Sequence, residues 1–385
     1  ARRIDVPFTD KTGARFFFVK IDAIERALHD IDSRARGGVK FDGAAPAEGE
    51  AQAFLVTSLI EEPFSSSVFE GAVATRDQAK KIINENRPPK TSGERMVLNN
   101  YRAIEFIKRR KKDPLTPAAI FELHKLVTRG TLGDASKEGA FRTEADDIVV
   151  ADEADGVVLH APPQAAELPA RAAALCDFAN AAETGDPFIH PVIRAIILHF
   201  TLAYDHPFVD GNGRAARALF YWSVLRDGYW LLEFISISKQ IREAPVKYGR
   251  AFLETESDEG DLTYFILNQL EMILKAIDAL DAFIINKKTE VAALENLLNG
   301  PDFRKKFNHR QLALLNRAAR APGLFAGYQP LPGCRDEMSS EPGALWPHWE
   351  YLSGAIGALG EPELERRAYE LRRLLRENGV TYNFY

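Results

Sequence analysis

Residues 191–204 constrain the fold more than any other segment, because they are apolar at almost every position. A helix that is apolar on all sides belongs in the middle of a helical bundle rather than at its surface. This helix is expected to end just before Pro207, since the residue preceding a proline avoids helical backbone angles. A second helix is expected from about Gly213 to Asp227. The sequence therefore predicts two central helices joined by a short loop.

The loop between these helices holds an unusual set of polar residues. Its sequence is His206-Pro207-Phe208-Val209-Asp210-Gly211-Asn212-Gly213-Arg214, with a second arginine at Arg217. Glycines let a ligand approach the main chain closely, and a helix N-terminus offers free N–H groups and a positive dipole end. Arg214 and Arg217 are three residues apart, so both project from one face of the helix, and their planar forks match phosphate oxygens. The loop is therefore predicted to bind a chain of phosphates.

Asp210 and His206 extend this prediction from binding to chemistry. A carboxylate beside an anion is favourable once a divalent metal ion is added, and Mg²⁺ is typically held by one or two carboxylates plus substrate phosphates. A neutral His206 can accept the proton of a hydroxyl that attacks phosphorus. Each residue alone has a structural explanation, as part of a turn or a surface ion pair. The whole set in this order favours a nucleoside triphosphate site with Mg²⁺.

Composition narrows the class of protein. The 385 residues are 46% hydrophobic, which is enough for two or three domains with a sizeable core. A net charge of −6 does not indicate a general nucleic-acid or membrane binder. The two cysteines, Cys176 and Cys334, argue against a zinc cluster or a disulfide scaffold and suit a reducing cytoplasm. No apolar run is long enough for a membrane span, and what lies upstream of Ala1 stays open.

Helical patterns dominate the remaining chain, with one exception. Residues 22–34 are expected to form a helix, followed by a loop over residues 37–51. Thr116-Pro117 predicts another helix start, with threonine as the N-cap. The basic run at residues 108–112 is expected at a solvated helix C-terminus rather than in a nucleic-acid site. Residues 147–160 predict a β-hairpin, either packed on helices or free to receive an extended segment by strand pairing.

At every fixed position the loop matches the signature of Fic-domain proteins, His-x-Phe-x-Asp/Glu-Gly-Asn-Gly-Arg-x-x-Arg. The resemblance extends over about residues 50–318. It includes the segments 99–101, 139–142, 160–163, 261–265 and 308–311. It implies a mainly α fold, a Fic-type helical bundle with a small β-hairpin flap. It also implies a protein adenylyltransferase, which transfers AMP from ATP to a Ser, Thr or Tyr hydroxyl of a protein and releases pyrophosphate.

The resemblance also assigns a role to each motif residue. His206 would be the general base, Phe208 an anchor in the core, and Asp210 the ligand of Mg²⁺, with Mn²⁺ as an alternative. The phosphates would be bound by Gly211, Asn212 and Gly213 (α and β), Arg214 (β) and Arg217 (γ). Gly213 favours nucleotidyl transfer, because a relative that acts as a kinase carries lysine there. The hairpin at residues 147–160 would be the flap that aligns the target.

A second matching motif lies upstream of the loop. Ser66 to Gly71 resembles the inhibitory Ser/Thr-x-x-x-Glu-Gly/Asn motif of the family, which places Ser66 and Glu70 at its fixed positions. A carboxylate and an arginine form a bidentate pair, so Glu70 is predicted to hold Arg217 away from the γ-phosphate. Spacing alone allows another interpretation, a capping box in which Ser67 and Glu70 begin a helix.

Other functions stay open at this point. The same glutamate could orient a water that removes AMP, and another nucleotide such as UMP could be transferred. In a different class, the chain could be a nucleotide-binding regulatory or interaction protein, although a pure binder has no need of His206. The expected partners are a protein substrate and a second copy in a homodimer, with no membrane and no nucleic acid.

Four regions are expected along the chain. They are an N-terminal helical region with the inhibitory motif (1–93), a Fic catalytic core (94–230), a C-terminal helical extension (231–326), and a linker and tail of uncertain role (327–385). The tail weakly resembles the opening segment of circularly permuted ATP-grasp proteins. Tyr248 and Tyr264 are expected to pack in the core rather than stack on adenine, and His160, His190 and His199 are expected to be structural.

Overall fold

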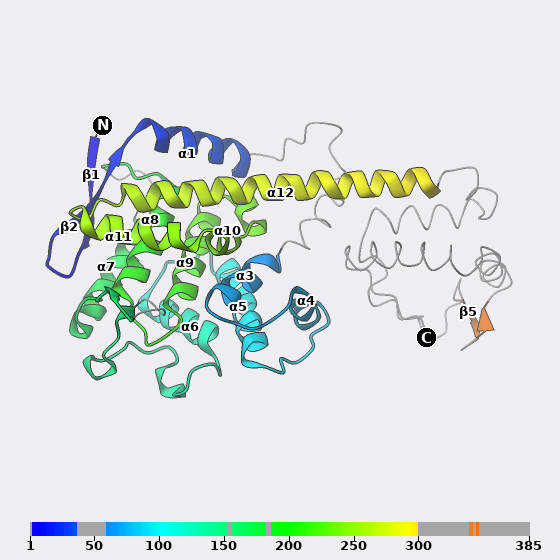
Figure 1. Cartoon of the computed structure of the whole chain (residues 1–385), viewed down its shortest axis with the longest axis horizontal. Coiled ribbons are helices and arrows are strands. Elements are labelled where there is room, and N and C mark those ends of the chain that lie inside the picture. Colours follow the sequence, from blue (N-terminus) through cyan, green and yellow to red (C-terminus); the bar gives the residue numbers. More distant parts are fainter. Residues whose placement is uncertain are drawn as a thin grey trace. The chain divides into compact units, whose positions relative to one another are not determined.

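The computed structural model describes residues 2–36, 59–151, 156–181, 186–298, 339–341 and 344–345. Within these residues the protein is mainly helical, and its strands form two-stranded antiparallel sheets (Figure 1), which confirms the predicted fold class. The chain divides into two compact units, one of residues 1–40 and 58–280 and the other of residues 41–57 and 281–385. All residues of the predicted site belong to the first unit. The expected boundaries at residues 93, 230 and 326 stay predictions.

The N-terminus forms a β-hairpin that the sequence analysis did not predict. Strands β1 (Arg2–Thr9) and β2 (Arg15–Lys20) pair antiparallel, so the region expected to be helical over residues 1–93 begins with strands. In β1 the residues alternate between buried and exposed, as expected for a strand with one face on the core. Phe17 also exchanges backbone hydrogen bonds with residues 260 and 262, which covers the free edge of β2.

The helices before the loop agree with the sequence patterns. Helix α1 (Asp22–Ala35) follows the hairpin, at the position predicted for residues 22–34. After it come α3 (Glu61–Phe69), α4 (Arg76–Asn84), α5 (Ser92–Arg109) and α6 (Pro117–Thr128). Thr116 caps α6 by accepting a hydrogen bond from the N–H of residue 119 at 3.2 Å, as predicted. The basic run lies at the C-terminal end of α5, also as predicted.

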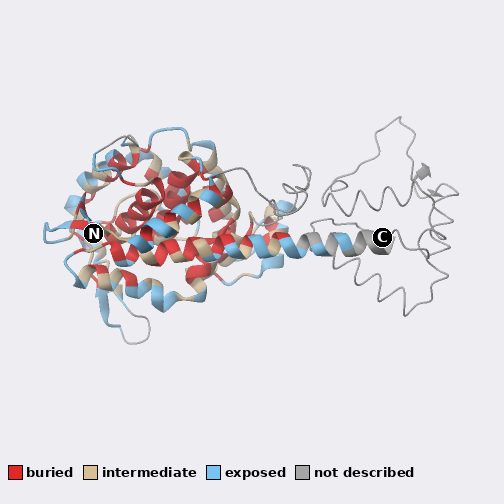
Figure 2. Cartoon of the chain, turned by 90° about the horizontal axis from the view of Figure 1, so that it is seen from above, coloured by how far each residue is buried: buried red, intermediate tan, exposed pale blue. Residues whose placement is uncertain are grey.

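Two buried helices form the centre of the first unit. Every residue of α8 (Pro191–Asp205) except Ala203 is buried, and α9 (Asn212–Arg226) packs against it. Figure 2 shows the buried residues gathered in the interior of this unit and the exposed residues on its outside. Helix α7 (Leu168–Asn180) lies beside α8. Helix α8 ends at Asp205, where the end was predicted just before Pro207, and α9 begins at Asn212, one residue before the predicted Gly213. The loop between the two central helices is therefore confirmed.

The remaining described elements are a hairpin, short 3₁₀ helices and the later helices and strands. The predicted hairpin at residues 147–160 is confirmed in a shorter form, with strands β3 (Val150–Ala151) and β4 (Val158–His160). Short 3₁₀ helices cover Ala135–Lys137, Glu144–Asp146, Ala165–Glu167 and Trp230–Phe234. The later elements are α10 (Ile237–Glu243), α11 (Pro245–Ser257), α12 (Thr263–Leu298), β5 (Ser339–Glu341) and β6 (Ala344–Leu345).

Three predictions lie outside the described residues: the loop at residues 37–51, the segment 308–311 and, apart from β5 and β6, the tail. Among the helices that the structure describes, none is long and apolar enough to cross a membrane.

Candidate functional site

His206 stands at the junction of α8 and the loop. Its backbone is left-handed, with φ 44°, and its N–H closes α8 by donating to the Leu202 carbonyl at 3.2 Å. Its Nδ1 lies 3.2 Å from the Ala203 carbonyl, which can only accept, so Nδ1 carries the hydrogen and Nε2 keeps a free lone pair. Burial lowers the pKa of His206 to about 4. At neutral pH the imidazole is therefore an uncharged base.

The loop is held in shape by its own amide and by α6. The side chain of Asn212 donates to the Phe208 carbonyl at 2.8 Å and accepts from the Phe208 N–H at 2.9 Å. The Phe208 ring is buried and stacks on His124 of α6, with ring centres 3.7 Å apart. The amide oxygen and one amide N–H of Asn212 are therefore engaged within the loop and fix its shape.

His124 is a site residue that the sequence analysis did not single out. Its Nδ1 accepts from the Gly139 N–H at 2.9 Å, so its Nε2 donates to the Asp210 carbonyl at 2.8 Å. Burial lowers the pKa of His124 to about 4, which keeps this tautomer neutral. The sequence held no signal for this contact, because its partners lie 15 and 86 residues away.

Both loop glycines are required by their surroundings. Gly211 has a φ of +83°, and a Cβ there would lie 2.6 Å from the Thr128 methyl group. At Gly213 a Cβ would lie 2.3 Å from Oε1 of Glu70 and 3.0 Å from a terminal nitrogen of Arg217. Gly213 therefore leaves the first turn of α9 open, and in this structure the Glu70 carboxylate lies there.

Arg214 is held by groups close to the loop. Its guanidinium is buried and donates to the Val127 carbonyl at 2.9 Å and to Oδ2 of Asp210 at 3.0 Å. Its Nε is buried and has no hydrogen-bond partner among the described residues. The Asp210 side chain is 54% exposed. Among the described residues no three His, Cys, Asp or Glu side chains cluster as metal ligands, so Asp210 is a single carboxylate at the edge of the loop.

Arg217 is held by a segment far away in the sequence. It donates to Oε1 of Glu70 at 2.7 Å and to Oγ of Ser66 at 3.0 Å, and its guanidinium lies 5.3 Å from the centre of the Phe69 ring. Burial disfavours the charge on Arg217, but Glu70, together with Tyr248 and Glu62, outweighs burial and holds the pKa of the guanidinium above its ordinary value. The predicted pairing of Glu70 with Arg217 is thus present.

Helix α3 presents Glu70 from its C-terminal end. The helix ends at Phe69, and Ser67 donates its hydroxyl back to the Pro63 carbonyl at 2.7 Å. The capping-box interpretation is therefore wrong, since Ser67 and Glu70 do not begin a helix. Buried Glu62 anchors the other end of α3 by accepting from the Ser236 hydroxyl at 2.8 Å and the Ser238 N–H at 3.0 Å.

The flap is joined to the end of α8 by His160. The two ring nitrogens of His160 contact the Tyr204 carbonyl at 2.7 Å and the Glu256 carboxylate at 2.9 Å. His190 accepts a hydrogen bond from the N-terminus of α8, and His199 contacts the Tyr248 hydroxyl at 3.1 Å, so all three histidines have structural contacts, as predicted.

The two tyrosines considered for adenine differ. Tyr248 is surrounded by rings, stacking on His199 and meeting Phe69 edge to face. Tyr264 is 39% exposed and donates to Asp258, so the prediction that it packs in the core is wrong. The sequence pattern could not distinguish the two, because both lie on amphipathic helices.

Comparison with known proteins agrees with this geometry. Residues 114–224 match the model of the Fic/DOC family. The chain is 30% identical over 173 residues to the protein adenylyltransferase Fic of Nematostella vectensis, covering 43% of this chain and 37% of that protein. It is 38% identical over 90 residues to the protein adenylyltransferase Fic of Drosophila virilis, covering 23% of this chain and 17% of that protein.

Solved structures show the same fold. A Fic family protein from Desulfovibrio desulfuricans aligns with a TM-score of 0.56 at 21% identity, over 80% of this chain and 86% of that one. A Fic-domain signalling protein from Bacteroides thetaiotaomicron aligns with a TM-score of 0.51 at 21% identity, over 68% and 98%. The family match covers α6, α8, the loop and almost all of α9. The chain therefore contains a Fic domain, and the two central helices with their loop are the core of that domain.

Proposed function

We propose that the protein is a self-inhibited protein adenylyltransferase, which transfers AMP from ATP to a Ser, Thr or Tyr hydroxyl of a protein target. The observation that carries this proposal is the state of His206. Its imidazole is neutral, its Nε2 is free to accept a proton, and it begins the loop that leads to the N-terminus of α9. A protein that only bound nucleotide would gain nothing from a base held in this tautomer.

The proposed transfer follows from these positions. The target hydroxyl attacks the α-phosphorus of ATP while Nε2 of His206 accepts its proton. The new O–P bond joins AMP to the protein, and the bond between the α-phosphorus and its bridging oxygen breaks to release pyrophosphate. Backbone N–H groups of residues 211–213 and the positive end of α9 would stabilise the α- and β-phosphates, together with Arg214. The buried Nε of Arg214 has no hydrogen-bond partner among the described residues, which is consistent with a donor that would bind an anion.

A magnesium ion fits the donor set. Asp210 is a half-exposed carboxylate next to the proposed phosphate site, and one carboxylate plus phosphate oxygens is a usual Mg²⁺ environment. Asp210 would hold Mg²⁺, or Mn²⁺, which when bound neutralises phosphate charge.

Glu70 would be the inhibitory residue, with Ser66 supporting it. The γ-phosphate needs Arg217 as a partner, and the carboxylate of Glu70 already accepts a hydrogen bond from that guanidinium. ATP would then bind without this contact and in an unproductive pose. The flap would present the target segment, since Val149, Val157, Val158 and Leu159 are exposed apolar residues around its strands.

Removal of AMP by the same site remains an alternative, because Glu70 lies beside Gly213 where a water could be oriented. The chain spans less than two fifths of the curated relatives reported above, so the activity of the whole protein, a homodimer and a cytoplasmic location stay predictions.

The transfer is tested with labelled ATP. We expect Glu70→Gly to add label from [α-³²P]ATP to proteins of a lysate supplied with Mg²⁺, and to add none from [γ-³²P]ATP beyond what the kinases of the lysate alone transfer. Glu70→Gly combined with His206→Ala should label nothing while it still binds ATP. Transfer of the γ-label would indicate a kinase, and unchanged labelling without His206 would rule out the proposed general base.

A further inference from the structure

We infer that Arg171 and Asp205 are positioning residues for His206, and that they make the turn of the N-terminal β-hairpin, residues 9–14, part of the active-site scaffold. The inference rests on the proposed function, because it concerns the placement of the base in that reaction. It assigns a role to residues that lie outside the Fic signature.

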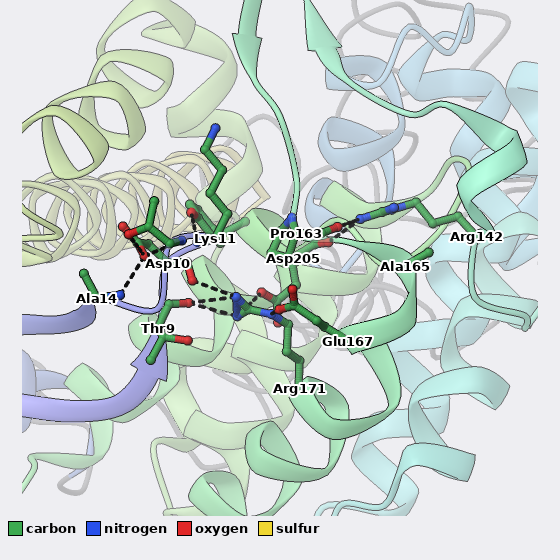
Figure 3. A network of polar contacts seen from close by, with 12 residues as sticks. Thr9, Asp10, Lys11, Ala14, Arg142, Pro163, Ala165, Glu167, Arg171 and Asp205 are labelled. Carbon is green, nitrogen blue, oxygen red and sulfur yellow. Dashed lines mark hydrogen bonds and ion pairs between the residues drawn. The ribbon is translucent and has the colours of Figure 1, made fainter.

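Arg171 joins three elements at the end of α8 (Figure 3). It lies in the first turn of α7 and donates to Oδ1 of Asp205 at 3.2 Å. Its other hydrogen bonds go to the Thr9 carbonyl at 2.9 and 3.1 Å, the Asp10 carbonyl at 3.0 Å and the Glu167 carboxylate at 3.1 Å. All five N–H groups of the guanidinium are therefore used.

The hairpin turn is held by its own hydrogen bonds and also contacts α8 directly. Oδ1 of Asp10 accepts hydrogen bonds from the Thr12 N–H at 2.8 Å, the Thr12 hydroxyl at 2.7 Å and the Ala14 N–H at 2.9 Å. The N–H of Lys11 donates to the Tyr204 hydroxyl at 3.1 Å. The turn therefore contacts α8 directly through Tyr204 and, by way of Arg171, through Asp205.

Asp205 is the residue directly before His206. Its side chain is only 7% exposed, and burial raises its pKa to about 7, although Arg171 offsets part of this rise. Oδ1 can accept the hydrogen bond from Arg171 whether or not the other oxygen is protonated.

Arg142 holds the same stretch through other contacts. Its Nε donates to the His206 carbonyl at 2.8 Å and its backbone N–H to the Pro207 carbonyl at 2.9 Å. A further bond reaches the Pro163 carbonyl at 2.5 Å (Figure 3). Arg142 thus fixes the backbone after α8, whereas Arg171 fixes the last side chain of α8.

These contacts of Arg142 and Arg171 matter because the backbone of His206 is strained. A left-handed residue other than glycine costs about 1–3 kcal/mol and persists only where its surroundings hold it. The imidazole is bonded to Ala203 in the last turn of α8, so its direction follows that turn. Loosening the turn would move the base and leave the phosphate-binding residues of α9 in place. The rate of transfer should therefore fall while ATP binding is kept.

The test uses the Glu70→Gly protein as the parent, with Arg171→Ala, Asp205→Ala and Asp205→Asn added singly. We expect the first two to lower kcat by about 10- to 100-fold, the effect of misplacing a catalytic group by about 1 Å. The KM and the calorimetric Kd for ATP should stay within about twofold of the parent values. The base acts only in the transition state, so moving it does not weaken the binding of ATP in the ground state. Asp205→Asn keeps an acceptor oxygen and should retain most of kcat.

Arg226→Ala is the matched control. Arg226 holds the opposite end of α7 by donating to the Ala179 carbonyl at 2.8 Å and to Asn180 at 3.2 Å, far along the helix from Arg171. It should lower Tm without lowering kcat. The inference is wrong if Arg171→Ala leaves kcat unchanged. It is also wrong if Arg171→Ala and Arg226→Ala both lower kcat in proportion to their loss of Tm.

A second readout separates this inference from the proposed function. The imidazole signals of His206, assigned in the NMR spectrum with His206→Ala, should shift and broaden in Arg171→Ala but not in Arg226→Ala. An inactive Glu70→Gly parent would refute the proposed transfer alone, whereas an unshifted His206 in Arg171→Ala would refute the positioning role.

Discussion

Arg214 and Arg217 lie one helical turn apart on α9 and are both buried, yet their partners come from different places. Arg214 bonds with Asp210 of its own loop and with the end of α6. Arg217 bonds with Ser66 and Glu70, which precede it by 151 and 147 residues. Arg214 is thus held by groups next to it in the loop and in α6, whereas Arg217 is held by a separate helix, α3. The two arginines of one signature therefore differ, because only Arg217 is engaged by a segment far away in the sequence.

The largest change should follow from removing the carboxylate on Arg217. We expect Glu70→Gly to raise the rate of AMP transfer by about 10- to 100-fold, because a hydrogen bond to a charged group is worth about 1.5–3 kcal/mol. Initial rates with labelled ATP measure this. Glu61→Ala, which removes an exposed ion pair with Arg76 from the other end of α3, should leave the rate unchanged. Equal rates for wild type and Glu70→Gly would contradict the account.

The two arginines themselves should respond differently. In the Glu70→Gly protein, Arg217→Ala should lower kcat/KM by about tenfold, because the γ-phosphate loses its partner. In the wild type the same change should have little effect, since Glu70 already engages Arg217. Arg214→Ala should lower kcat/KM in both backgrounds. The comparison fails if Arg217→Ala has the same effect with and without Glu70.

A smaller effect is expected from the anchor of α3. Glu62→Gln replaces the buried carboxylate that binds two serines by a neutral amide, which weakens these hydrogen bonds. We expect it to lower Tm and to release transfer by about three- to tenfold, since a lost hydrogen bond is worth about 1 kcal/mol. A lower Tm with no rise in the transfer rate would mean that α3 keeps Glu70 in place without Glu62.

Ser66→Ala should have a weaker effect of the same sign. Its hydroxyl accepts one of the hydrogen bonds that hold Arg217 beside Glu70. Transfer should rise by about threefold, as expected for a bond of about 0.5–1 kcal/mol. A fall in the rate would show instead that Ser66 supports Arg217 during catalysis.

The pH dependence should be slight near neutrality. The pKa of His206 is lowered from its ordinary value to about 4, so the neutral base is present above that pH and is lost only as the pH falls through it. The acid limb of kcat/KM, which reports the free enzyme, should therefore lie near pH 4 to 5 rather than 6.5 in Glu70→Gly. A limb at 6.5 that disappears in His206→Ala would show that the imidazole is more solvated than its burial indicates.

The sequence predicts best those elements that depend on residues close together in the chain. The helices of residues 191–226 and the loop between them depend on local patterns, such as the apolar run and the proline, and they were placed to within about one residue. The N-terminal hairpin was missed although Ile4, Val6 and Phe8 alternate with polar or exposed positions, which is a strand signal. The proline within that strand weakens the signal.

The contacts that hold the site could not be predicted in the same way. His124 and Arg142 contact the loop through backbone carbonyls, which cannot be recognised in a sequence. Arg171 contacts the side chain of Asp205 at the end of α8, 34 residues away. The pairing of Glu70 with Arg217 was predicted from the motif. That Glu70 follows the C-terminal end of α3 was not predicted, because the spacing of Ser67 and Glu70 suits a helix start equally well.

The central claim is that Glu70 withholds Arg217 from the γ-phosphate, and the affinities for ATP and ADP test it most directly. Calorimetry on wild type and Glu70→Gly, each with Mg²⁺, gives the contribution of the γ-phosphate as the ratio of the two Kd values. We predict nearly equal Kd values for ATP and ADP in the wild type, and a preference for ATP of about tenfold or more in Glu70→Gly. The same ratio in both proteins would contradict the claim.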